Sequence, residues 1–104
     1  MGFRGVAKDI FSTGANQTGS RSLATQYQNT SDLPMLVAIT LTAGGSAPVV
    51  TVAMGLTSGS LSTVMTATLP VSVANPVQFI VPSGTFYMVS ATQTPTITIW
   101  AEMY

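Results

Sequence analysis

Residues 34–42 read Pro-Met-Leu-Val-Ala-Ile-Thr-Leu-Thr and carry the strongest structural signal in the chain. Side chains in a β-strand point alternately to opposite faces, so this segment has two different faces. One face holds large apolar residues: Met35, Val37, Ile39 and Leu41. The other holds Leu36, Ala38, Thr40 and Thr42. Alternation sustained over this length predicts a strand that begins after Pro34.

The surrounding sequence is uncharged, because no residue from Leu33 to Ala101 is Asp, Glu, Lys or Arg. Charged residues make up 6% of the chain, whereas an average globular domain contains about 25%. The stretch is rich in Thr and Val, which favour strands because β-branched side chains are stiff at χ1 and fit a pleated sheet. With so little charge repulsion between molecules, we expect a β module that is covered by other protein, most simply by copies of itself.

Further candidate strands surround this segment, and Gly and Pro mark the turns between them. The loop at 43–48 is expected to close a hairpin, and Pro82-Ser83-Gly84 to form a tight turn. Pro70 and Pro76 indicate an edge-like or bulged run, because proline cannot donate to a β-ladder. The other expected strands are 23–28, 49–54, 61–68, 77–81, 86–91 and 96–103. We therefore predict an all-β, antiparallel, jelly-roll-like β-sandwich of about seven or eight short strands.

The last strands are apolar on both faces, although a sheet with one wet face should alternate between apolar and polar residues. Around the turn at 82–84, one face is expected to hold Val77, Phe79, Val81, Phe86 and Met88, and the other Ile80, Tyr87 and Val89. In the final strand, Ile97, Ile99, Ala101 and Met103 alternate with Thr98, Trp100, Glu102 and Tyr104. Two interpretations stay open: both faces are covered within the monomer, or the second face packs on a partner subunit. The second predicts an oligomer interface at Tyr87, Val89, Trp100 and Tyr104, since Trp and Tyr are enriched at interfaces.

Two regions are expected: an N-terminal arm at residues 1–19 and a β-sandwich domain at 20–104. The arm holds half of the charged residues and ends in the turn-rich segment 12–19. It is either a flexible tail or a segment that docks on a neighbouring protein. The predicted anchor residues for docking are Phe3, Arg4, Ile10 and Phe11.

Several kinds of chemistry lack their usual residues. The chain has no His and no Cys, so the common nucleophile–base pairs and zinc sites have no members. The only carboxylate side chains are those of Asp9, Asp32 and Glu102. Asn29 and Asp32 share one segment, where capping of a turn is favoured over calcium binding. We expect no catalytic residue, no cofactor and no metal site, and hence no enzyme.

Charge and hydropathy also limit the classes of binding partner that this chain can have. Three basic and three acidic residues cancel, whereas nucleic-acid binders need a basic patch. No apolar run approaches the roughly 20 residues that span a bilayer. We expect neither nucleic-acid binding nor a membrane span. Arg21 and Glu102 stand at the two edges of the uncharged stretch, which suggests that they pair.

Three segments in order resemble a small β module of tailed-bacteriophage fibre and virion proteins. In residues 19–35, Arg21 precedes the turn Tyr27-Gln28-Asn29-Thr30, and Pro34 begins the next strand. Residues 79–87 are similar to the family's hairpin of an apolar residue, Val, Pro and Gly followed by Tyr. Residues 99–103, Ile-Trp-Ala-Glu-Met, resemble its terminal strand. The resemblance covers most of residues 19–104.

This resemblance implies a homotrimeric β-sandwich located on a virion. The family module usually ends a longer fibre, whereas here only residues 1–19 precede the module. The chain is therefore expected to be either a free-standing protein or a domain cut from a longer fibre. We therefore expect a short fibre, tip or capsid decoration protein that contacts other virion proteins (capsid, portal or tail) through its N-terminal arm. The alternative is an adhesin that recognises a host-surface glycan, with Trp100, Phe86 or Tyr87 stacking on sugars.

Overall fold

A computed structural model describes residues 14–104, which form eight strands and one 3-10 turn. No helix in this part of the chain is long or apolar enough to cross a bilayer. The predicted anchor residues Phe3, Arg4, Ile10 and Phe11 lie outside the described residues. The elements are β1 (Gly14–Asn16), η1 (Thr18–Ser20), β2 (Gln26–Gln28), β3 (Met35–Thr42), β4 (Val49–Thr57), β5 (Ser60–Thr68), β6 (Ala74–Val81), β7 (Phe86–Ala91) and β8 (Thr96–Met103).

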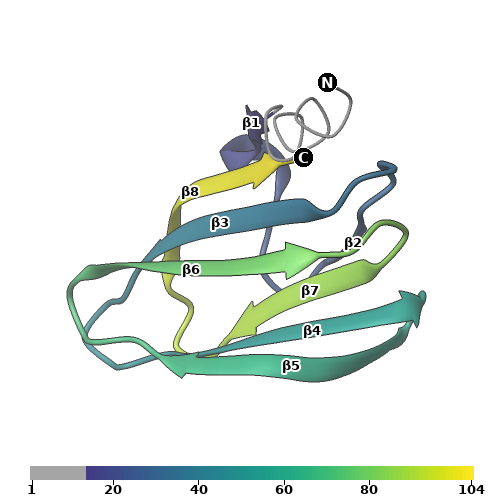
Figure 1. Cartoon of the computed structure of the whole chain (residues 1–104). Coiled ribbons are helices and arrows are strands. Elements are labelled where there is room, and N and C mark those ends of the chain that lie inside the picture. The colour runs from purple at the N-terminus through teal and green to yellow at the C-terminus, as the bar shows by residue number, and fades with distance from the viewer. Residues whose placement is uncertain (1–13) are drawn as a thin grey trace.

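The strands form two four-stranded antiparallel sheets packed as a sandwich (Figure 1). The strand order is β1-β8-β3-β6 in the first sheet and β2-β7-β4-β5 in the second. Both orders follow the jelly-roll pattern, in which strands early and late in the sequence lie side by side. The predicted all-β sandwich is confirmed.

β3 lies in the first sheet between β8 and β6, and its alternation is as predicted. Every odd-numbered residue from Met35 to Leu41 is buried, and every even-numbered residue from Leu36 to Thr42 is only partly buried. β6 is an edge strand of the same sheet and contains Pro76. An edge strand tolerates proline because one side of its backbone needs no ladder partner. The edge-like character predicted for the run between Pro70 and Pro76 is confirmed only for Ala74–Pro76, because residues 71–73 form a turn.

Most consecutive strands belong to different sheets, so two expected hairpins are absent. Only β4 and β5 form a hairpin between neighbours in sequence. The loop at 43–48 carries the chain from β3 in the first sheet to β4 in the second, so it does not close a hairpin. Pro82-Ser83-Gly84 forms the predicted tight turn, because the Thr85 N–H donates to the Pro82 carbonyl over 3.1 Å. This turn joins β6 of the first sheet to β7 of the second, so the hairpin implied by the resemblance at 79–87 is not formed.

The core lies between the sheets and contains residues that we had expected at an oligomer interface. Tyr87, Val89 and Trp100 have no exposed surface within the single chain. The interface prediction is therefore wrong for these three residues. Because β6 and β7 face each other from opposite sheets, Tyr87 and Val89 point inward together with Val77, Phe79 and Val81. Complete burial of each such side chain contributes about 1.5–3 kcal/mol to stability.

A bulge in β8 changes which residues of the last strand face the core. Thr40 pairs with Ile99, whereas Leu41 pairs with Ile97, so one extra residue lies on β8 at this point. A bulge of this kind reverses the alternation locally. Ile97 therefore packs against the core, as does Trp100, while Ile99 is exposed. The predicted strict alternation of the last strand is wrong at this position.

The boundary expected at residue 19 also changes. Gly14–Asn16, assigned to the N-terminal arm, forms β1 and pairs with residues 101–103 of β8. The first sheet thus already begins at residue 14. The strand expected at 23–28 is reduced to β2 at 26–28, and Ala24 has a positive φ that interrupts extended backbone.

A substitution at Gly55 tests how closely the two strands of the β4–β5 hairpin pack near its turn. A Cβ atom at Gly55 would collide with the backbone carbonyl of Ser60, which cannot move aside as a flexible side chain would. We expect Gly55→Ala to lower the free energy of unfolding by about 1–3 kcal/mol, measured by urea denaturation. Gly44→Ala is the matched control, because a Cβ there meets nothing within 4 Å. Equal stability of the two variants would contradict the close packing of this hairpin.

Candidate functional site: a buried ion pair beside a polar pocket

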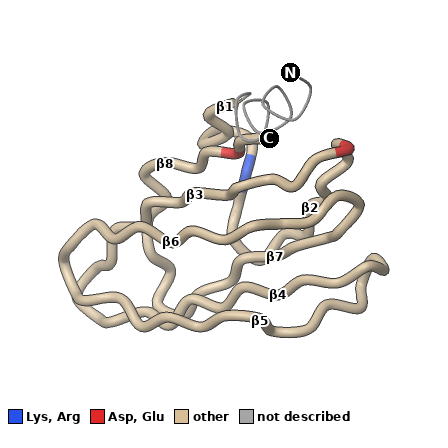
Figure 2. Tube along the Cα trace, in the orientation of Figure 1, with Lys and Arg blue, Asp and Glu red and all other residues tan. Residues whose placement is uncertain are grey.

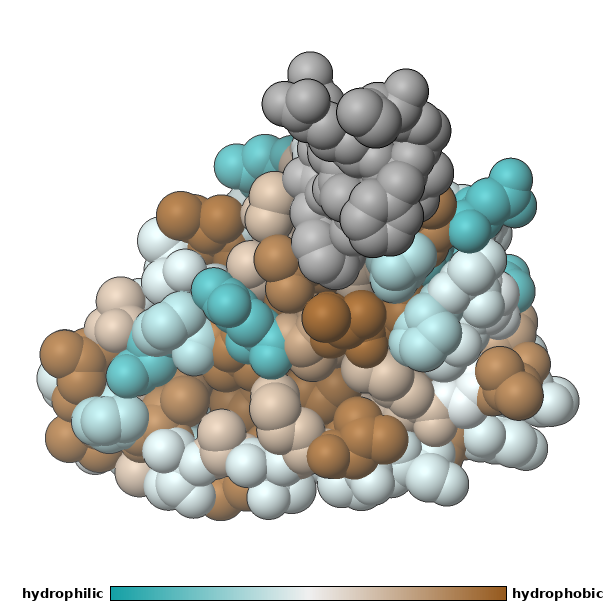
Figure 3. Space-filling view, viewed as in Figure 1, coloured by the Kyte–Doolittle hydropathy of each residue, from teal (hydrophilic) through white to brown (hydrophobic). Residues whose placement is uncertain are grey.

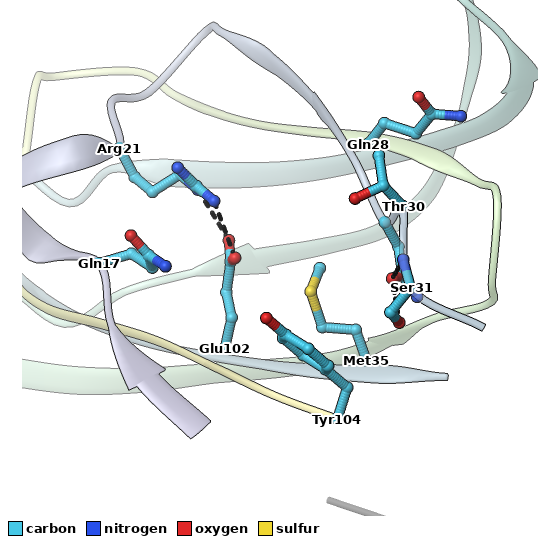
Figure 4. A pocket seen from close by; sticks show the side chains of 9 residues that line it. Gln17, Arg21, Gln28, Thr30, Ser31, Met35, Glu102 and Tyr104 are labelled. Carbon is cyan, nitrogen blue, oxygen red and sulfur yellow. Dashed lines mark hydrogen bonds and ion pairs between the residues drawn. The ribbon is translucent and has the colours of Figure 1, made fainter. Parts of the chain in front are cut away.

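Arg21 and Glu102 form the ion pair that their places in the sequence suggested. Glu102 points inward from β8, and Arg21 follows η1. Arg21 Nε lies 2.8 Å from Oε2, and Nη2 lies 2.9 Å from Oε1, so the contact is bidentate (Figure 4). The side chains of Arg21 and Glu102 are only 22% and 5% exposed. The pair is therefore mostly buried, unlike the surface ion pairs that contribute little to stability.

Two core residues also donate hydrogen bonds to the Glu102 carboxylate. The Tyr87 hydroxyl donates to Oε2, and Trp100 Nε1 donates to the same oxygen over 3.1 Å. The guanidinium of Arg21 lies 4.6 Å from the ring centroid of Tyr27 and donates to the carbonyl of Ser20. Charged groups tolerate burial only with such partners. The cluster joins β8, β7 and the segment before β2.

These contacts set the protonation states. Burial alone would raise the pKa of Glu102, but hydrogen bonds from Arg21 and Tyr87 outweigh it and lower the pKa below its ordinary value. Burial, reinforced by the neighbouring carboxylate, raises the pKa of Tyr87. The hydrogen bond to Glu102 raises the pKa of Arg21 further above its already high value. At neutral pH the cluster thus consists of one cation, one anion and a neutral phenol.

Glu102 is poorly suited to acid–base chemistry. Both of its carboxylate oxygens accept hydrogen bonds, and its lowered pKa keeps it ionised. Asp32 is exposed in the loop between β2 and β3. Figure 2 shows the red segment of this loop apart from the red segment of β8, which lies beside the blue one. The third carboxylate, Asp9, lies outside the described residues.

A pocket of about 310 Å³ opens beside the ion pair. Gln17 and Arg21 lie on one side of it and Thr30 on the other, with Glu102 and Tyr104 between them (Figure 4). The sequence drew attention to Arg21, Glu102 and Tyr104, but it carried no signal for Gln17 or Thr30. Tyr104, predicted at an oligomer interface, is partly buried and lines this pocket.

Asn29 holds the pocket's second wall in place. Its Nδ2 donates to the carbonyls of Leu33 and Val81, at 2.8 and 2.9 Å. Its Oδ1 accepts from the backbone N–H and the hydroxyl of Ser31. Its backbone also exchanges hydrogen bonds with Gly84 and Thr85. The turn-capping role predicted for Asn29 is confirmed, and the same side chain also ties the β2–β3 loop to β6.

In the described part of the chain, no three Asp or Glu side chains gather where they could hold a metal ion. Comparison with protein families, with characterised proteins and with solved structures finds no match for this chain.

Removing the charge of Glu102 tests the buried pair. We expect Glu102→Gln to lower the free energy of unfolding at pH 7 by about 2–4 kcal/mol, because Arg21 loses its buried counter-charge. Asp32→Asn is the matched control and should change stability by less than about 0.5 kcal/mol, since Asp32 is exposed. Urea denaturation gives both values. Similar losses in the two variants would contradict a special role for the buried carboxylate.

The same pair predicts a direction for the pH dependence of stability. The pKa of Glu102 is lower in the folded chain than the ordinary value of 4.5. Its contribution is therefore complete above that value and declines as the pH falls further. Repeating the urea denaturation from pH 7 to pH 3 should show the difference between wild type and Glu102→Gln shrinking below about pH 4.5. A difference that is constant or grows with acid would refute this.

Proposed function

We propose that this chain is a structural protein of a bacteriophage particle, a homotrimeric β module that serves as a short fibre, tip or capsid decoration. The observation that carries the self-association is the outer face of the sheet β1-β8-β3-β6. The β-sandwich fold of the chain and the lack of charged residues from Leu33 to Ala101 also support the proposal.

This outer face consists of paired rows across β6, β3 and β8. Leu36 lies opposite Ile80 on one side and Met103 on the other. In the next row Ala38 lies between Gln78 and Ala101, and in the third Thr40 lies between Pro76 and Ile99. The face is thus uncharged and largely apolar. Figure 3 shows brown surface over the region of β3 and β6.

Ile80 and Ile99 are 52% and 44% exposed on this face. Single exposed aliphatic residues are common on soluble proteins, but a largely apolar face that extends across three strands indicates a contact surface. None of the described residues on this face is charged, so no repulsion between like charges on them keeps copies of the protein apart. A closed symmetric assembly would bury this face in every copy, and stability gained by association suits a particle that must persist outside cells.

The proposed location on a virion and the proposed three-fold symmetry rest on a resemblance to the phage fibre module. The segments that carry this resemblance are residues 19–35, 79–87 and 99–103. Jelly rolls occur in viral capsid proteins and also in lectins, so the fold alone does not decide the role. Phe3, Arg4, Ile10 and Phe11 remain our proposed contacts to other virion proteins. The adhesin alternative loses two of its stacking residues, since Tyr87 and Trp100 are buried.

Charge substitution on the outer face tests self-association. We expect wild-type protein to have three times the mass of one chain in light scattering coupled to size exclusion. Ile80→Lys and Ile99→Lys should each shift it towards the monomer, because each places a charge in the interface. Val64→Lys is the control: Val64 is 55% exposed but lies on β5 of the other sheet. Circular dichroism confirms that each variant remains folded.

A monomeric wild-type chain would refute self-association through this face. A trimer dissociated by Val64→Lys but not by the two outer-face variants would place the interface on the other sheet.

A further inference from the structure

The pocket beside the ion pair contains polar groups that the folded chain leaves unused. Within residues 14–104, no hydrogen bond engages the side-chain amide of Gln17 or the hydroxyls of Thr30 and Tyr104, whereas the backbone of Gln17 pairs with Trp100 and Ser20. Figure 4 shows these groups directed into the pocket from different sides. We propose that this pocket binds a neutral, polyhydroxylated ligand about the size of one sugar ring.

Arg21 adds further donors to the pocket. A guanidinium carries five N–H groups. Two of them point to Glu102 and one to the carbonyl of Ser20. The remaining two have no partner among the described residues. The Gln17 side-chain amide and the two hydroxyls each both donate and accept, so the pocket wall offers donors and acceptors, and the hydroxyl groups of a sugar can pair with both.

Charge selects a neutral ligand over an ion. Among the described residues of the pocket wall, only Arg21 and Glu102 are charged, and their bidentate contact cancels both charges. An anion would gain little from a cation that is already neutralised and would meet the Glu102 carboxylate. A cation would meet the Arg21 guanidinium. A hydroxylated neutral molecule avoids both penalties.

Size and shape agree with a small ligand. A pocket of about 310 Å³ is at the lower end of ligand-binding cavities, which span roughly 300–1,000 Å³. The partly buried ring of Tyr104 provides apolar surface for the C–H face of a sugar ring, and the buried side chain of Met35 lies at the back of the pocket.

The walls are also held before any ligand arrives. Glu102 fixes Arg21, and the hydrogen bonds of Asn29 fix the loop that carries Thr30. Walls that need no ordering on binding keep more of the contact energy as affinity. All pocket residues come from one chain, so this inference does not depend on the proposed self-association.

The test is a titration of the full-length, ¹⁵N-labelled chain followed by NMR. The probes are glucose, galactose, mannose and N-acetylglucosamine, each raised to about 10 mM so that millimolar affinities are visible. Sodium sulfate serves as the anionic probe. We expect at least one sugar to shift the amide signals of Gln17, Thr30 and Tyr104 in a saturable manner, and sulfate to leave them unchanged.

Variants that remove one polar group each show whether binding uses this pocket. Thr30→Val and Tyr104→Phe delete single hydroxyls with little change of shape, and we expect each to weaken the bound sugar by about 5- to 10-fold. Thr66→Val is the matched control, because Thr66 is exposed on β5 of the other sheet. It should leave the dissociation constant unchanged.

Three outcomes would overturn the proposal. In the first, none of the four sugars shifts the pocket signals. In the second, a sugar binds but Thr30→Val and Tyr104→Phe weaken it no more than Thr66→Val does, which places the ligand elsewhere. In the third, sulfate shifts the pocket signals and the sugars do not, which shows an anion site at Arg21. None of these outcomes bears on the mass of the assembly, so the two proposals fail separately.

Discussion

One buried carboxylate constrains the way this sandwich closes. Glu102 points inward from β8 and would be strongly destabilising there without partners, because burial disfavours its charge. Its partners come from three places: Tyr87 on β7 of the opposite sheet, Trp100 on its own strand, and Arg21 from the segment before β2. The two sheets and the early part of the described chain therefore meet at one group. Each of them must be in place for the charge to be stabilised.

The jelly-roll connections separate two surfaces with different properties. The polar pocket lies at the end of the sandwich beside Glu102. The contact between Arg21 and Glu102 and the hydrogen bonds of Asn29 hold its walls in place. The outer face of β6, β3 and β8 is uncharged and largely apolar, with Ile80 and Ile99 exposed. We propose a small hydroxylated ligand for the end of the sandwich and a second copy of the chain for the outer face. A module that uses both would combine assembly through its face with recognition at its end.

Local features of the chain were predictable, and long-range features were not. The alternation of β3 was correct because it depends only on neighbouring residues, and Pro76 correctly marked an edge strand. The bulge in β8 escaped prediction because Ile97 and Ile99 look equivalent until the pairing register with β3 is known. The turn at 82–84 was mistaken for a hairpin because Pro and Gly permit a change of direction whether or not the chain also changes sheet. Tyr87 was placed on the wrong face for the same reason. Trp100 was assigned to an interface because its strand is apolar on both faces, and the sequence does not show which face the second sheet covers.

By itself the sequence determined that this chain forms strands, where most of them lie, and that its few charges stand outside a long neutral stretch. It also indicated that Arg21 and Glu102 pair. The tertiary structure decided which face of each strand is inside, that the pair is buried, and that Gln17, Thr30 and Tyr104 meet around one pocket. The reason is physical. Strand formation follows from properties of adjacent residues, whereas burial and the assembly of a site depend on which distant strands pair and in which register.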